Sequence, residues 1–167
     1  MKAGPRLYAK LKKHRLRTML GCLALACLAC CLFGLNQQDN VREAVVRDEI
    51  ASWRIGASDA RPPAAVFVSF DGRDPNDNFI ERFRESGPVV YKVSQGLHQM
   101  PGDIYTEFWV NPATGLQGNL VPVGRLVWLG PFMARVEVNY PTHGSVSTVT
   151  KSFSGWVVTA RRQTWMH

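Results

Sequence analysis

The sequence predicts an α+β fold: an N-terminal transmembrane helix, then an exported domain in which a curved antiparallel sheet packs on a long helix. Three observations support this prediction. An uncharged apolar run spans 19–35, an amphipathic helical pattern follows it, and the C-terminal third contains short alternating segments separated by turns. We therefore expect a basic cytoplasmic arm (1–18), a transmembrane helix (19–35) and an exported domain (36–167).

Only basic charges precede the apolar run. Residues 1–18 hold seven Lys and Arg and no acidic residue; removing those seven from the chain's 20 Lys and Arg leaves 13, equal to its 13 Asp and Glu. A helix over 19–35 is about 25 Å long, slightly shorter than a hydrocarbon core of roughly 30 Å. Basic flanks favour the cytoplasmic side. The pattern predicts a single-pass protein of the bacterial inner (cytoplasmic) membrane, N-terminus in the cytoplasm and C-terminal domain outside. The lipid bilayer is then an expected partner, contacted by Lys10, Lys12, Lys13, Arg15 and Arg17.

Two alternatives to a retained anchor stay open. The triplet Ala24-Leu25-Ala26 is a cleavage pattern for a signal peptide, although it comes early in the apolar run. Cys27 follows a loose lipobox-like sequence, which is a pattern for lipidation. All four cysteines lie inside the run, where a hydrated metal site is not expected.

The first half of the exported domain predicts two helices and a strand. Residues 38–55 place Val46, Ile50 and Trp53 on one helical face, and 65–70 forms a Val- and Phe-rich strand. The aspartates in 71–77 stand three apart, which does not suit an EF-hand calcium loop. We instead predict a helix with Asp74 as its N-cap.

The rest of the chain predicts further strands around one long connection. A strand at 89–94 leads into 95–120, which is rich in Pro and Gly and also apolar. We expect it either to include another short strand or to form a flap against the core, and it is our first candidate for a partner-binding surface. Antiparallel strands in a meander are then predicted over 121–129, 132–140, 145–153 and 156–165.

Two helices followed by a curved antiparallel sheet are typical of cystatin-like and NTF2-like folds. Ordered blocks of the sequence also resemble a family of small uncharacterised bacterial membrane-anchored proteins. These blocks are Arg42–Val45, Asp74–Phe83, Pro88–Ser94 and Gly155–Val158 with Trp165. The resemblance covers nearly all of 41–165 and implies bacterial origin and a compact α+β domain. That family carries no established activity, so the resemblance transfers no functional residue.

No catalytic, nucleotide-binding or zinc motif occurs in the sequence, so we predict no cofactor and no metal. Nucleic acid is not an expected partner, because the exported domain has balanced charge. We predict a non-enzymatic binding or scaffold module at the bacterial envelope, whose concave sheet recruits an envelope protein or a second copy of the chain. The alternative is a small-molecule-binding or enzymatic pocket in the NTF2-like cone. Candidate residues for the pocket or partner surface are His98, Trp109, Trp128, Tyr140 and Trp156.

Overall fold

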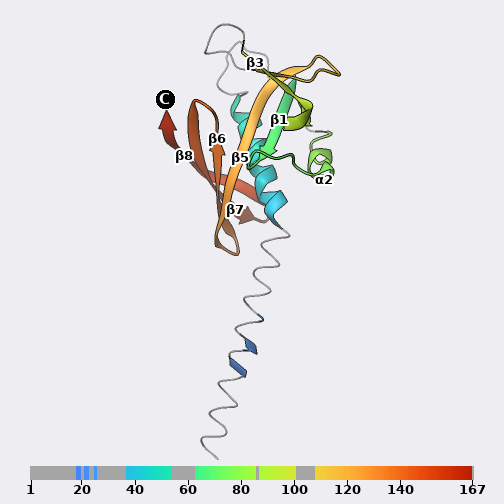
Figure 1. Cartoon of the computed structure of the whole chain (residues 1–167). Helices are drawn as coiled ribbons and strands as arrows, with labels where there is room; N and C mark the ends of the chain where they lie inside the picture. The colour runs from blue at the N-terminus through green and yellow to red at the C-terminus, as the bar shows by residue number, and fades with distance from the viewer. Residues whose placement is uncertain are drawn as a thin grey trace, which may run out of the picture. The chain divides into compact units, whose positions relative to one another are not determined.

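The computed structural model describes residues 18–19, 21–22, 25, 37–53, 63–85, 87–100 and 108–166. Clustering of contacts separates two compact units, Met1–Gln37 and Gln38–His167. All of the described strands belong to the second unit, in which a helix over 37–53 precedes the first strand (Figure 1). The amphipathic helix predicted over 38–55 is therefore present in its described part, and 54–55 lie outside the described residues.

Within the described residues, eight strands form one sheet. Its main order is β2-β1-β5-β6-β7-β8, and β4 joins β3 to β5 beside this path. The elements are β1 (Ala65–Phe70), α2 (Asp77–Glu81), β2 (Val89–Lys92), η1 (Val93–Gln95), β3 (Leu97–Gln99), β4 (Phe108–Val110), β5 (Gln117–Gly130), β6 (Met133–Asn139), β7 (His143–Ser152) and β8 (Gly155–Met166).

The predicted fold class, a cystatin-like/NTF2-like antiparallel sheet packed on a long helix, is wrong. Among the described residues, strands make up 50% and helices 26%, so the domain is mostly sheet. The sheet is also mixed, because β1 runs parallel to both β2 and β5. Every residue of β1 is buried, which is typical of a central strand covered on both faces. The antiparallel meander predicted from 121 to 165 is confirmed, because β5–β8 pair antiparallel in chain order.

The membrane prediction is also contradicted. Among the described residues, no helix is long and apolar enough to cross a bilayer. A run of 17 residues is short for that purpose, since about 20 are needed. Most of 19–35 lies outside the described residues; Met19, Gly21, Cys22 and Leu25 are helical. We therefore withdraw the single-pass inner-membrane assignment. Also outside the described residues are the basic side chains Lys10, Lys12, Lys13, Arg15 and Arg17.

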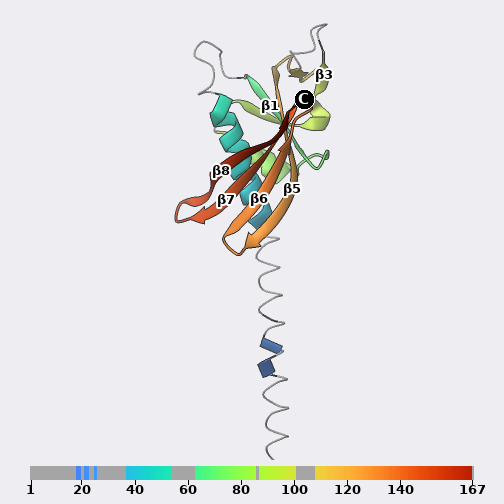
Figure 2. The ribbon, with the colours of Figure 1, turned by 90° about the vertical axis from the view of Figure 1, so that its left-hand side faces the viewer.

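Val41, Val45, Val46 and Ile50 from the helix over 37–53 belong to the same buried cluster as residues of the sheet. Their i, i+4 and i+5 spacing places them on one helical face. The strand residues of this core include Val66 and Val68 from β1, Val121 and Val123 from β5, and Ala134, Val136 and Val138 from β6. One face of the sheet is thus the inner face, closed by this core. Figure 2 looks at β5–β8 from the other side, with the helix behind them.

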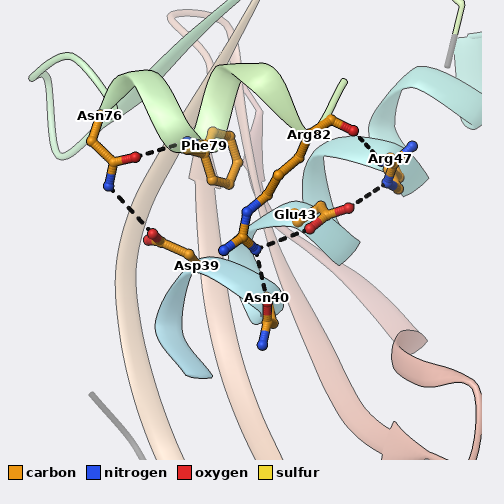
Figure 3. Close-up of polar contacts among 7 residues, drawn as sticks. All are labelled: Asp39, Asn40, Glu43, Arg47, Asn76, Phe79 and Arg82. Atoms are coloured by element: carbon orange, nitrogen blue, oxygen red, sulfur yellow. Dashed lines mark hydrogen bonds and ion pairs between the residues drawn. The ribbon is translucent and has the colours of Figure 1, made fainter. Parts of the chain in front are cut away.

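Hydrogen bonds and an ion pair join the helix over 37–53 to α2. Arg82, at the end of α2, donates to Asn40 Oδ1 at 2.7 Å and forms an ion pair with Glu43 Oε2 at 3.1 Å. Arg47 pairs with the other oxygen of Glu43 at 2.8 Å and donates to the Arg82 carbonyl at 2.8 Å (Figure 3). Glu43 and Arg47 belong to the same helix, and both contact Arg82 at the end of α2. These two contacts hold α2 against that helix.

The prediction of Asp74 as the N-cap of α2 is wrong by two residues. The cap is Asn76, whose Oδ1 accepts from the Phe79 backbone N–H at 2.7 Å and whose amide donates to Asp39 (Figure 3). Asp74 instead accepts hydrogen bonds from the backbone N–H and hydroxyl of Ser94, and these bonds lower the pKa of its carboxyl. Both residues are good caps, so the sequence alone did not decide between them.

We expect Phe79→Ala to lower the free energy of unfolding by about 3–5 kcal/mol, the usual cost of truncating a buried phenylalanine. Phe79 is fully buried and packs edge-on against Phe70 with ring centroids 4.7 Å apart. Urea denaturation measures the change. Phe153→Ala is the matched control, because Phe153 lies fully exposed in a hairpin turn and should shift stability by less than about 0.5 kcal/mol. Similar losses in both variants would contradict this core assignment.

Candidate interaction surface

The five aromatic and histidine residues predicted for a pocket or partner surface occupy three different places. His98 stacks on Trp109 with ring centroids 5.3 Å apart, where β3 pairs with β4. Trp128 and Trp156 pack edge-on at 5.6 Å, within or against the main core. Tyr140 stacks on His143 at the start of β7. The structure thus brings four of the five candidates together as two pairs, while the ring that stacks on Tyr140 is not one of the five.

His98 and Trp109 belong to a second, smaller cluster on β1. Val66 and Val68 face the main core, so Phe67 between them faces the other side of the strand. Phe67 stacks on Tyr91 and Trp109, with centroids 5.6 and 5.9 Å away. The described parts of 95–120 therefore cover β1, as a flap would; 101–107 lie outside the described residues.

The face of β5–β8 that points away from the core is the most distinctive surface of the described chain. We call it the outer face. Strand register defines it through three cross-strand rows. These rows are Met133–Thr150–Val157, Val127–Arg135–Thr148–Ala160 and Glu137–Val146–Arg162. No described helix or strand covers the outer face in Figure 2.

Large apolar side chains lie toward both ends of the outer face, with Met133 and Val157 opposite Thr150 and Trp165 opposite Gly144. Those with exposures between 36% and 47% are Val127, Leu129, Met133, Val157 and Trp165. The open face of an antiparallel sheet is normally polar, because only the covered face needs apolar residues. Trp165 lies over Gly144, where an added Cβ would come within 2.2 Å of the indole nitrogen. The glycine thus lets a large aromatic ring lie flat against β7.

Beside these apolar residues, the outer face is hollowed. A depression of about 420 Å³ extends across β6, β7 and β8. Small or medium side chains line it, together with three charged ones on its outer strands. The lining residues on this face are Arg135, Glu137, Val146, Thr148, Ala160, Arg162 and Thr164. Among the described residues, the side chains of Arg135, Glu137 and Arg162 form no ion pair.

A buried charge cluster ties β8 to the helix on the inner side of the sheet. Arg161 Nη2 lies 2.9 Å from Glu49 Oε1 and 2.5 Å from Asp48 Oδ2. Tyr140 donates its hydroxyl to Glu49 Oε2 at 3.1 Å. Glu49 is only 4% exposed, so its charge depends on these two partners. This cluster anchors the outermost long strand of the sheet.

The environment shifts two pKa values in this cluster. Burial raises the pKa of the Glu49 carboxyl above its ordinary value, although the Arg161 charge and the Tyr140 hydrogen bond oppose the shift. Burial also raises the pKa of the Tyr140 phenol, and the neighbouring Glu49 charge adds to that effect. Both oxygens of the Glu49 carboxyl face protein groups, which leaves it no open side for a substrate. We conclude that the cluster supports structure.

Arg161 and Arg162 lie on opposite faces of β8 because they are adjacent, and a β-bulge decides which of them faces inward. The register of β7 with β8 shifts between Thr148 and Val149, so Arg161 pairs with Ser147 and faces inward while Arg162 pairs with Val146 and faces outward. In the sequence, Arg161 and Arg162 stand close to Trp165 as a small basic-aromatic patch, for which the simpler interpretation is a strand end with a solvated face. Adjacent residues of a strand always face opposite sides, so the sequence places one arginine on each face, but it does not show the bulge that decides which one faces inward.

Comparisons with protein-family models, with curated proteins and with solved structures gave no match. The argument for function therefore rests on the surface itself.

We expect Arg161→Ala to destabilise the protein by about 2–3 kcal/mol, because it leaves the buried Glu49 charge with only the Tyr140 hydroxyl. Arg162→Ala is the matched control on the neighbouring residue and should change the free energy of unfolding by less than about 0.5 kcal/mol. Chemical denaturation of both variants measures the difference. Equal losses would contradict the inward and outward assignment of the two arginines.

We expect Glu49→Gln to become more stable relative to the natural chain as pH rises above about 4.3, the ordinary pKa of Glu. With its pKa raised on folding, Glu49 holds its proton more tightly in the folded state, so its contribution to stability falls as pH rises through the folded pKa. Gln keeps an acceptor for Tyr140 but cannot ionise. Unfolding free energies at a series of pH values give the difference. A difference that shrinks with rising pH would contradict this assignment.

Proposed function

We propose that this chain is a non-enzymatic binding or scaffold module that holds a protein partner on the outer face of β5–β8. The observation that carries the proposal is the set of partly exposed apolar side chains on one face of the sheet: Val127, Met133 and Val157 lie toward one end of it, and Trp165 lies toward the other, beyond the row Glu137–Val146–Arg162. Contiguous apolar surface rimmed by polar residues is a feature of protein interaction sites. The unpaired charges of Arg135, Glu137 and Arg162 supply the polar part of such a surface.

The inner face is a poorer interface. The sequence analysis assigned partner binding to the concave side of the sheet, but that side is filled by core residues from β1, β5, β6 and the helix over 37–53. A partner there would have to displace the helix. The outer face needs no such rearrangement.

The edge strand β8 adds a second means of contact. It is twelve residues long, contains no proline and pairs only with β7 in the described sheet. An edge of this kind accepts an extended segment through backbone hydrogen bonds. Because β8 also contributes Val157, Arg162 and Trp165 to the outer face, a partner can contact both the edge and the face.

A small-molecule or enzymatic pocket, the alternative function, has less support. Trp128 and Tyr140 pack against the core and Trp156 belongs to it, so these aromatics are already engaged by protein. Glu49, the buried carboxyl beside Tyr140, is enclosed by Arg161 and Tyr140.

Site-specific photocrosslinking in cells that produce the full chain tests the proposal. Benzoylphenylalanine replaces Val127 or Thr148 on the outer face, or Arg73 as a control on an exposed turn. We expect adducts of one defined mass from both outer-face positions and none from the control, because a specific interface brings one partner within reach of the probe. Absence of adducts from both outer-face positions, or equal adducts from all three, would contradict the proposal.

A further inference from the structure

We propose that the partner on the outer face is a second copy of this chain, related by a two-fold axis that runs along β7. This inference rests on the proposed function and adds the identity of the partner. It is drawn from the arrangement of charge in the row Glu137–Val146–Arg162. Opposite charges stand one strand to either side of Val146, on β6 and β8.

This row is complementary to itself. In an interface between identical faces, a two-fold axis along β7 places β6 of each copy over β8 of the other. Glu137 then faces Arg162 of the second copy, and Arg162 faces Glu137 of the second copy. Both side chains lack an ion-pair partner among the described residues, so the pairing creates two contacts without breaking any.

The neighbouring rows also fit this arrangement. In the second row, the long Arg135 side chain faces Ala160 of the second copy, where the short side chain leaves room. In the row Met133–Thr150–Val157, Met133 faces Val157 of the second copy, so two apolar side chains that are each 40% exposed cover one another. The depression of about 420 Å³ lies between these charged groups and can receive side chains from the facing sheet.

Sheet twist does not disrupt the ion pairs. Two packed sheets usually cross at about 30°. Glu137 and Arg162 each lie one strand, or about 4.8 Å, from the axis, so this rotation moves them by only about 2.4 Å. A flexible arginine side chain accommodates such a displacement. The pairs therefore form near the centre of the interface, where they are least affected by twist.

A partner with charges of one sign fits the row less well. An acidic segment would pair with Arg162 but face Glu137 with a like charge, and a basic segment would do the reverse. A second copy supplies both signs at the required spacing. For this reason we infer self-association from the same surface that supports the proposed function.

Charge reversal tests the inference. The variants are Glu137→Arg, Arg162→Glu and the double variant. The controls are Glu85→Arg and Arg73→Glu, which make the same changes at exposed positions outside the outer face. Sedimentation velocity of the full chain at several concentrations gives the dimer Kd, in a mild non-ionic detergent because residues 19–35 are apolar.

We expect each single reversal to raise the dimer Kd at least about tenfold, because two attractive pairs become two repulsive pairs. The double variant should return to within about threefold of the natural chain. A mixture of the two single variants should form a mixed dimer, since one copy then presents two positive positions and the other two negative ones. The controls should leave the Kd unchanged.

Single reversals without effect, or a double variant no better than either single one, would overturn the two-fold pairing. The photocrosslink at Thr148 then separates this failure from failure of the proposed function. An adduct whose mass differs from twice that of the chain overturns self-association and retains a binding face for another protein. No adduct at all overturns both.

Discussion

Strands β5–β8 must bury one set of alternating side chains, and the rest of the structure depends on that burial. Leu126, Val136 and Val149 point toward the helix over 37–53, and hydrophobic burial of such side chains is worth about 1.5–3 kcal/mol each. Because a strand has a period of two, fixing this set also fixes which residues face away. The outer face is therefore specified by the core, even though its own residues contribute little to folding. A surface presented in this way is rigid, which lowers the entropic cost of binding.

The one costly feature of the interior is the Glu49 carboxylate. Burial of an unpaired charge is strongly unfavourable, and only Arg161 and Tyr140 offset it from the sheet side. Arg161 comes from β8, the outermost long strand, so a charge on the helix holds the strand that would otherwise fray first. The bulge near Thr148 makes this arrangement possible. It turns one arginine inward for stability and leaves Arg162 on the outer face for contact with a partner.

Much of the local structure could be predicted from the sequence, because periodicity records which face is buried. The alternation in 132–140 separates Ala134, Val136 and Val138, which are buried, from Arg135 and Glu137, which lie on the outer face. Phe79 and Phe83 are buried as their helical spacing predicts. These predictions needed no knowledge of which segment pairs with which.

The remaining errors arise where the structure depends on partners distant in sequence. Periodicity does not state whether strands are parallel, so the pairing of β1 with both β2 and β5 was missed. Asp74 and Asn76 are equivalent as caps until Ser94, twenty residues away, engages the aspartate. The candidate site was missed for a similar reason: Val127, Met133 and Val157 share one face only when β5, β6, β7 and β8 pair in register.

Hydroxyl-radical footprinting of the full chain over a range of concentrations tests most directly whether the outer face of β5–β8 is an interface. If it is, oxidation of Met133 and Trp165 slows as concentration rises, because a second copy covers them. Met100 is 66% exposed and is not part of the outer face, so its oxidation rate stays constant as an internal control. Trp156 is 8% exposed in the core and remains protected throughout. Oxidation of Met133 and Trp165 at a rate independent of concentration would contradict self-association through this face.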